Sequence, residues 1–392
     1  MKKLVVAFMA SNMIAGFSFA DEIKLGIIFG FTGPIESLTI PMAMGAELAM
    51  KEVSDSGAFL GGSTVTPLRA DSTCIDSAAA VAAAERLVTS DKVHGIVGGD
   101  CSGVTGAILQ NVARPNGVVM VSPSATSPAL STAADDGLFF RTSPSDARQG
   151  QIMTEILMEN GVSSVAVTFS NSDYGKGLAE AFETAFVKAG GKVTINAAHE
   201  DGKADYAAEV GALAAAGGDV LVISGYIDQG GGGILRAALD TGAFDTFHFP
   251  DGMISENLEI NYGDEVNGSR GQHPGTDSPG MAKFASMAAD FDGSSPFAPE
   301  SYDAAALIML AMQAAGSSAS ADYMTKIMEV ANAPGTQIFP GELAKALEIL
   351  AGGGDIDYVG GSAVELIGPG ESAGAYRQIK IDGGKITTVK YR

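Results

Sequence analysis

Strands and amphipathic helices alternate along the first third of this chain, and this alternation constrains the fold more than any other feature. An apolar-rich run over 23–29 predicts a strand, and the apolar side chains that follow are spaced as on one helix face: Ala46, Ala49, Met50 and Val53. The pattern continues with a strand over 63–70, a helix over 77–89, a strand over 93–97, a helix over 102–113 and a strand over 117–121. Such a series predicts an α/β fold with a parallel, doubly wound sheet.

The same alternation restarts after residues 139–142. The predicted elements are a helix over 146–160, a strand over 164–169, a helix over 174–189, a strand over 192–197, a helix over 204–216, a strand over 219–224, a helix over 233–241 and a strand over 245–249. A strong helix over 301–315 and a terminal hairpin over 376–389 follow. A chain of roughly 370 residues exceeds what one core usually covers, so we expect two doubly wound lobes.

The first twenty residues resemble a secretory signal. Lys2 and Lys3 precede an apolar run over 4–17, and small residues at Ser18 and Ala20 match a signal peptidase site. A membrane anchor is the alternative, but the run is shorter than the ~20 apolar residues that a spanning helix needs. We therefore expect cleavage after Ala20 and export to the periplasm.

Charge limits the partners of the mature chain. The formal net charge is −22, and loss of the two signal lysines makes it −24. Because a strongly acidic surface repels phosphate backbones and anionic lipid, we expect neither nucleic-acid nor membrane-surface partners.

Cys74 and Cys101 are the two cysteines, and they follow two successive predicted strands. In an oxidising compartment such a pair is expected to form a disulfide, and two buried thiols are the alternative. No CxxC motif supports a redox or metal role.

Hydroxyl side chains follow two neighbouring strands of the first predicted lobe. One strand ends in Gly98-Gly99-Asp100-Cys101-Ser102-Gly103 and the next in Ser122-Pro123-Ser124-Ala125-Thr126. The carboxyl edge of an open α/β sheet is where ligands bind, and a helix that begins there offers free N–H groups to an anion. The sequence predicts a carboxylate site here, with helix capping by Ser102 and Thr126 as the alternative.

Three strand ends of the second lobe carry polar groups that would face the first lobe. They are Asp173-Tyr174-Gly175, Gly225-Tyr226 and Pro250-Asp251-Gly252. No nucleophile elbow, zinc-protease or phosphate-loop motif occurs, and the four histidines form no metal-ligand pair. Gln229-Gly230-Gly231-Gly232-Gly233 lacks a following lysine and is interpreted as a flexible strand-to-helix turn.

Taken in order, these landmarks resemble the type I periplasmic binding proteins of the leucine/isoleucine/valine-binding family, which serve ABC importers. The matching segments are Phe31-Thr32-Gly33-Pro34, Asp71-Ser72-Thr73-Cys74 with Asp100-Cys101-Ser102, Ser122-Pro123-Ser124-Ala125-Thr126, Asp173-Tyr174-Gly175-Lys176-Gly177 and Pro299-Glu300-Ser301-Tyr302-Asp303-Ala304. The resemblance implies two Rossmann-like lobes joined by crossings near 141–145, 268–275 and 368–374. The first lobe would comprise 21–142 and 272–368, and the second 143–271 and 369–392.

The resemblance also implies the ligand set. Ser102 and Thr126, with the backbones of Ser102 and Ser124, would hold the carboxylate of an amino acid. Tyr226 and Asp251 would contact its ammonium, and Tyr174 would contribute to the closed cleft. The branched-chain members have Glu where this chain has Asp251, a carboxylate one methylene shorter. This departure moves the ammonium, inserts a water or indicates a different solute.

The expected function is capture of a small, branched-chain-like amino acid for a membrane ABC permease, by a monomer without cofactor, metal or catalytic residue. One alternative is another solute, namely an amide, a urea-like compound or an aromatic acid, for transport or for receptor sensing. A secreted enzyme with Ser102 as nucleophile is a third hypothesis, but it would need a base, and His94 is expected inside a strand.

Overall fold

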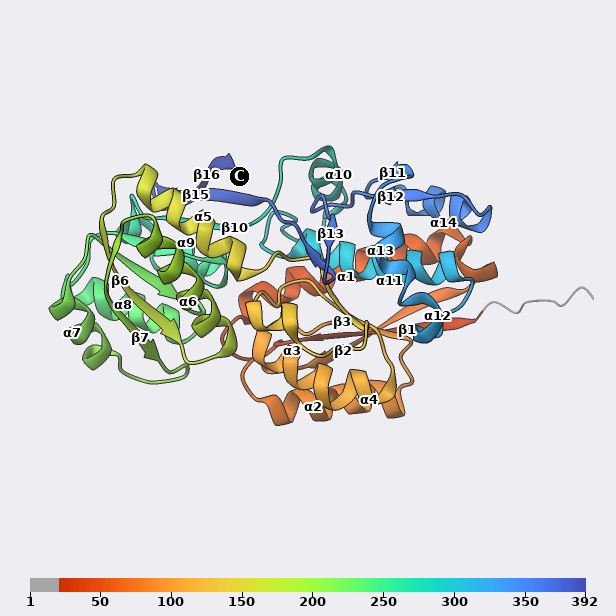
Figure 1. Ribbon diagram of the computed structural model, residues 1–392, viewed down its shortest axis with the longest axis horizontal. Helices are drawn as coiled ribbons and strands as arrows, with labels where there is room; N and C mark the ends of the chain where they lie inside the picture. The colour runs from red at the N-terminus through yellow and green to blue at the C-terminus, as the bar shows by residue number, and fades with distance from the viewer. Residues whose placement is uncertain (1–20) are drawn as a thin grey trace, which may run out of the picture.

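The computed structural model describes residues 21–392, which form two α/β lobes side by side (Figure 1). The signal segment 1–20 lies outside the described residues. Each lobe is built around a seven-stranded sheet. The predicted fold class is thereby confirmed.

The sheet of the first lobe has the order β13-β14-β5-β4-β3-β1-β2. All neighbouring strands are parallel except β13 and β14. The strands are β1 (Glu22–Phe29), β2 (Thr64–Asp71), β3 (Gly95–Gly98), β4 (Met120–Ser122), β5 (Phe139–Arg141), β13 (Leu366–Ile367) and β14 (Glu371–Ser372). Because β3 and β4 are neighbours, the two hydroxyl-bearing strand ends meet at one edge, as the sequence predicts.

The sheet of the second lobe has the order β16-β15-β10-β9-β8-β6-β7. Its strands are β6 (Ser164–Ser170), β7 (Lys192–His199), β8 (Val220–Ser224), β9 (Phe247–Phe249), β10 (Arg270–Pro274), β15 (Tyr376–Asp382) and β16 (Lys385–Tyr391). The first five are parallel, whereas β15 is antiparallel to both β10 and β16. The predicted terminal hairpin is therefore present, as β15 and β16.

Helices cover both sheets. Those of the first lobe are α1 (Glu36–Ser56), α2 (Ser77–Glu85), α3 (Ser102–Ile108), α4 (Arg114–Asn116), α10 (Pro279–Met287), α11 (Ala298–Ala315), α12 (Ser320–Tyr323), α13 (Lys326–Ala331) and α14 (Leu343–Ala351). Those of the second are α5 (Asp146–Glu159), α6 (Asp173–Lys188), α7 (Ala207–Ala216), α8 (Gly230–Thr241) and α9 (Glu256–Asn261). A small sheet of β11 (Thr336–Ile338) and β12 (Ile356–Tyr358) adjoins α13 and α14.

The core of the first lobe is centred on α11, which is buried from Ala298 to Gln313 and packs along α1. Gly45 permits this close approach, because a Cβ there would lie 2.4 Å from the Ala298 carbonyl oxygen. The start of α11 is thereby held against the start of the chain, next to the cleft between the lobes.

The strand pairing places two lobe boundaries a few residues later than expected, within the expected crossings near 268–275 and 368–374. Arg270–Pro274 belongs entirely to the second sheet, so the boundary at 271/272 would divide a strand. Glu371 pairs with Arg141 in the first sheet, so the boundary at 368/369 precedes a strand of the first lobe. Glycine-rich composition indicates where the chain can bend, but long-range pairing decides where it leaves a sheet.

The interpretation of residues 229–233 as a flexible turn is also wrong. Helix α8 begins at Gly230, so four glycines of this segment are helical. A Cβ on Gly231 would lie 2.4 Å from the Met253 sulfur, and one on Gly233 would lie 2.3 Å from the Tyr206 ring. The glycines therefore form a closely packed first turn of a helix.

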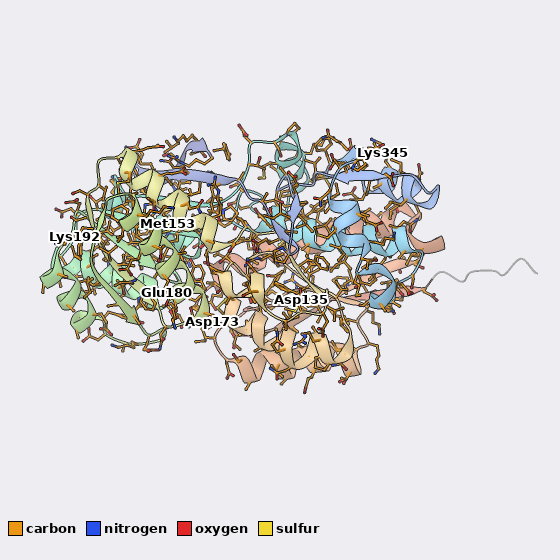
Figure 2. All side chains as sticks on the ribbon, viewed as in Figure 1. Asp135, Met153, Asp173, Glu180, Lys192 and Lys345 are labelled. Atoms are coloured by element: carbon orange, nitrogen blue, oxygen red, sulfur yellow. A yellow bond between two sulfur atoms is a disulfide. The ribbon has the colours of Figure 1, made fainter. Side chains whose placement is uncertain are left out.

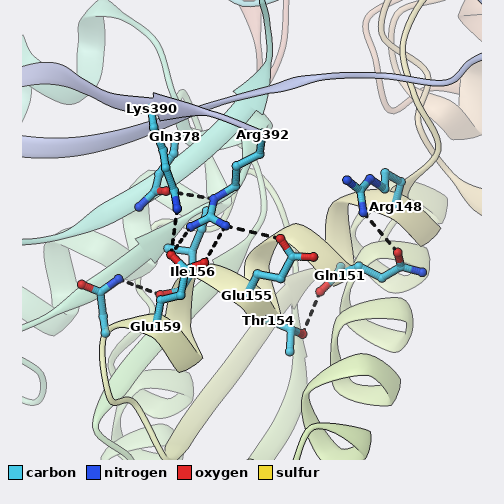
Figure 3. A network of polar contacts seen from close by, with 11 residues as sticks. Arg148, Gln151, Thr154, Glu155, Ile156, Glu159, Gln378, Lys390 and Arg392 are labelled. Atoms are coloured by element: carbon cyan, nitrogen blue, oxygen red, sulfur yellow. Dashed lines mark hydrogen bonds and ion pairs between the residues drawn. The ribbon is translucent and has the colours of Figure 1, made fainter.

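A polar network ties the C-terminus to α5 (Figure 3). Arg392 donates to Gln378 at 2.9 Å and to Glu159 at 2.9 Å, and Lys390 donates to Glu159 at 3.0 Å. Hydrogen bonds from Arg392 and Lys390 lower the pKa of the exposed Glu159 carboxyl to about 2. Strand β16 is thereby attached to the helix that begins at the first crossing.

Candidate functional site

A cavity lies between the lobes, at the carboxyl ends of the parallel strands of both sheets. The space that protein atoms leave free between its lining residues is about 320 Å³, and this value includes the part that is open to solvent. The lining consists of Ile35, Leu38, Asp100, Cys101, Ser102, Ser124 and Phe297 of the first lobe and Tyr174, Tyr226, Asp251 and Gly252 of the second. The start of α6, marked by Asp173, lies where the two lobes meet (Figure 2).

Five of the six predicted ligand residues line this one cavity, as that list shows. Thr126 does not line it: its side chain is buried, and its hydroxyl has no hydrogen-bond partner among residues 21–392. Sequence reasoning gave no ligand role to Asp100, Cys101 or Phe297. Phe297 follows no strand and has a φ of 65°, so no local pattern marks it.

The serines of the first lobe tie two strand ends together. The Ser102 hydroxyl accepts the Ser127 N–H at 3.1 Å, and the Ser124 hydroxyl donates to the Asp100 carbonyl at 3.1 Å. The capping alternative for Ser102 is wrong, because Cys101 occupies the N-cap of α3. The Ser102 hydroxyl proton is engaged by no neighbour in the described chain and is available to a ligand acceptor.

The predicted disulfide between Cys74 and Cys101 is present, and Cys101 lines the cavity. Beside it, the buried Asp100 carboxylate accepts the Gly30 N–H at 2.6 Å and the Ser72 hydroxyl at 3.0 Å. Burial raises the pKa of Asp100 above its ordinary value. Asp100 thus joins the ends of β1, β2 and β3 behind the cavity wall.

The second lobe contributes two stacked phenols and one carboxylate. The rings of Tyr174 and Tyr226 have centroids 5.1 Å apart. The Tyr174 hydroxyl donates to Asp251 Oδ1 at 2.5 Å, and the Gly252 N–H donates to the same oxygen at 2.8 Å. Burial raises the pKa of both tyrosines well above 10, so both phenols keep their protons at neutral pH.

Gln149 of α5, which sequence reasoning missed, fixes Asp251 by two hydrogen bonds and does not itself line the cavity. Its side-chain nitrogen donates to Asp251 Oδ2 at 2.9 Å and to Asp146 Oδ1 at 2.7 Å. Its oxygen accepts from Gln272 at 3.0 Å and from the Asp251 N–H at 3.3 Å. All four hydrogen-bonding positions of this amide are therefore used inside the protein.

The chain of amides extends to His248 of β9. Gln272 Oε1 lies 2.7 Å from His248 Nε2, so the imidazole, the two glutamines and Asp251 form one buried network. Burial lowers the pKa of His248 to about 4, which keeps the ring neutral at pH 7.

Two carboxyl groups share the Gln149 amide. Burial raises the pKa of Asp146 well above its usual range, and the negative charge of Asp251 adds to this rise. Burial also raises the pKa of Asp251, while hydrogen bonds from Tyr174 and Gln149 oppose the effect. Two adjacent buried carboxyl groups resist joint ionisation. We therefore assign the proton to Asp146 and the negative charge to Asp251, which accepts more hydrogen bonds.

Among the described residues that line the cavity, none is Lys, Arg or His. The nearby Arg141 is buried but donates to the carbonyls of Ala125 and Ser127, both at 2.9 Å, and to Glu371 at 2.5 Å. Within residues 21–392 no group of three or more His, Cys, Asp or Glu could hold a metal ion. No helix in that range is both long and apolar enough to cross a membrane.

The lobes touch on one side of the cavity. Asp228, two residues after Tyr226, accepts the Ser37 N–H at 2.8 Å and donates its own N–H to the Pro34 carbonyl at 3.1 Å. We refer to this arrangement, with the lobes in contact, as the closed form.

Two α/β lobes around a cavity lined by polar groups from both define a two-lobe binding protein of the α/β class. The family model described as "Periplasmic binding protein" matches residues 22–343, and the chain belongs to this family. The family resemblance predicted from the sequence is thereby confirmed.

A curated relative and two solved structures illustrate the similarity. The chain is 33% identical over 231 residues to a Brucella melitensis protein named Leu/Ile/Val-binding protein homolog 3, and the match spans 58% of this chain and 60% of that relative. A leucine-binding protein of Thermotoga maritima superposes with a TM-score of 0.79 at 22% identity, over 94% of this chain and 98% of that one. A solute-binding protein of R. palustris in complex with benzoate gives 0.75 at 18%, over 94% and 96%.

Proposed function

We propose that this protein is the periplasmic substrate-binding component of an ABC importer and captures a small aliphatic amino acid between its lobes. The observation that carries the proposal is the opposition of two kinds of polar group across one cavity. The first lobe presents the Ser102 hydroxyl at the start of α3, and the second presents the Asp251 carboxylate. Such an arrangement suits the carboxylate and the ammonium of a zwitterion.

The lack of a basic side chain among the described residues of the lining supports an ammonium-bearing solute over a simple acid. A benzoate-like anion would enter a cavity beside the Asp251 carboxylate, with no cation among the described lining residues to offset its charge. An amino acid brings its own cation to Asp251. Charge-assisted hydrogen bonds of this kind contribute roughly 1.5–3 kcal/mol each.

The remainder of the lining supports an apolar side chain on the solute. Ile35 and Leu38, at the start of α1, and Phe297, before α11, form the apolar part of the cavity.

In the proposed mechanism the ligand shifts a population and undergoes no covalent change. A solute that contacts residues of both lobes binds the closed form more tightly than the open form and so favours closure by that difference. The closed protein would then deliver the solute to the membrane permease. Export through the signal at residues 1–20 would place the protein in the periplasm.

The test is calorimetric titration of the mature protein after co-purified ligand has been removed by unfolding and refolding. The solutes are leucine, isoleucine, valine, alanine, glutamate and benzoate. We expect a Kd near micromolar, about −8 kcal/mol, for the aliphatic amino acids and none for benzoate. If the refolded protein binds benzoate and none of the amino acids, the proposed solute is wrong and an aromatic acid is the solute instead.

Asp251→Asn should weaken leucine binding at least about tenfold, because it removes the charge that offsets the ammonium. Asp240→Asn is the matched control, since Asp240 lies on the outer helix α8 with a 64% exposed side chain. Equal affinities of the two variants would refute the role of Asp251.

A further inference from the structure

A carboxylate of the second lobe takes the place of the missing N-cap on a helix of the first. Helix α1 begins at Glu36, and its N-cap residue Ile35 makes no side-chain hydrogen bond. The second amide of the helix, Ser37 N–H, has no partner within the helix, as at every helix start. Asp228 Oδ2 accepts this amide at 2.8 Å across the cleft.

Two further contacts hold Asp228 in this position, and a third links the neighbouring serines of the two lobes. Its own N–H donates to the Pro34 carbonyl at 3.1 Å, and Asn257 donates to its Oδ1 at 2.6 Å. The hydroxyl oxygens of Ser37 and Ser255 lie 3.0 Å apart. Asn257 and Ser255 belong to the same lobe as Asp228, so the second lobe presents a prepared acceptor to the first.

We propose that Asp228 is a positioning residue that caps helix α1 only in the closed form and thereby sets the closed population and the affinity for solute. Asp is among the best capping residues, and a negative charge is also favourable at a helix N-terminus. Opening the lobes returns the Ser37 amide to water. Closure and helix capping are therefore one event.

The cap is adjacent to the cavity on both sides. Ile35 and Leu38, which flank the capped amide, line the cavity, and so does Tyr226, two residues before Asp228. Asp228 itself does not line it. The residue therefore holds the apolar start of α1 over the solute without touching the solute, and this inference rests on the proposed capture of a solute by closure.

Closure can be measured without any ligand. Ser37→Cys together with Ser255→Cys replaces two hydroxyls that are 3.0 Å apart in the closed form, so a disulfide between them traps closure. The Ser37 backbone amide, which Asp228 accepts, is unchanged in this parent variant. The rate of cross-linking by glutathione disulfide, followed by non-reducing electrophoresis, reports the closed population.

Adding Asp228→Ala to the parent should slow cross-linking about tenfold, which corresponds to about 1.4 kcal/mol. Asp228→Asn keeps a capping oxygen and should stay within about threefold of the parent. Asp240→Ala, on the exposed face of α8, should match the parent. Cross-linking of Asp228→Ala at the parent rate would overturn the proposal.

Leucine titration of the Asp228 variants in the chain with its native serines separates this inference from the proposed function. We expect Asp228→Ala to weaken leucine binding about tenfold and Asp240→Ala to leave it unchanged. If Asp228→Ala slows cross-linking but no variant binds leucine, the capping role of Asp228 is supported and the proposed amino acid solute is refuted. If Asp228→Ala changes neither the cross-linking rate nor leucine binding, the proposed amino acid solute is supported and the capping role of Asp228 is refuted.

Discussion

Replacing Gln149 with leucine should destabilise the second lobe more than any exposed substitution on the same helix. The amide of Gln149 is fully buried and makes four hydrogen bonds, two of them to the carboxyl groups of Asp146 and Asp251. Leucine has a similar volume but neither donates nor accepts. The substitution therefore leaves both carboxyl oxygens, the Gln272 amide and the Asp251 N–H without these partners.

The magnitude follows from the number of orphaned groups. Each buried polar group that loses its partner destabilises a protein by about 1–3 kcal/mol, and neighbouring losses are not additive. We expect a total of about 4 kcal/mol for Gln149→Leu. In a unit of roughly 150 residues this lowers the Tm by about 10 °C.

Differential scanning calorimetry measures this effect, and circular dichroism at 25 °C establishes that the variant is folded. Gln151→Leu is the matched control, because Gln151 is exposed on the same helix and its side chain accepts, within the described part of the chain, only a 3.4 Å hydrogen bond from Arg148 (Figure 3). Its Tm should change by less than about 2 °C. The reasoning is refuted if the Gln149 variant melts within 2 °C of the wild type or if both variants shift equally.

Two further predictions concern the first lobe. The double substitution Cys74→Ser with Cys101→Ser should lower the free energy of unfolding by about 3.5 kcal/mol, because the chain-entropy model assigns that value to a loop with this separation of 27 residues. Urea unfolding of the variant and of the wild type measures the difference, and equal free energies would contradict it. Burial raises the pKa of Glu300 to about 8, so its contribution to stability is full below pH 4.5 and is lost as the pH rises to 8. Glu300→Gln removes this loss and should stabilise the protein by about 4 kcal/mol at pH 8 and by less than about 1 kcal/mol at pH 5. Calorimetry at both pH values tests this prediction, and an equal effect at both would contradict it.

Much of the fold could be predicted because its signals are local. The apolar runs of β1, β6 and β8 and the spaced apolar faces of α1 and α11 follow from side-chain periodicity alone. β10 could not be predicted, because Arg-Gly-Gln-His-Pro has neither an apolar run nor alternation. Its place in the sheet depends on pairing with β9 and β15, far away in the sequence.

The residues of the candidate site also fall into those that the sequence could predict and those that it could not. Ser102, Ser124 and Asp251 could be predicted, because each follows a predicted strand and parallel strands bring their carboxyl ends to one edge. Gln149 lies within a helix whose sequence gives its amide no distinguishing mark. Thr126 follows a strand too, yet its buried side chain lies outside the cavity lining.

The sequence by itself determined the two doubly wound lobes, the paired cysteines and the edge at which ligand groups collect, since each depends on patterns a few residues long. Only the tertiary structure decided which polar groups meet across the cleft. Ser37 and Asp228, which meet across the cleft, are 191 positions apart. Contacts of that kind depend on how whole lobes pack against each other, and no local pattern of residues records that packing.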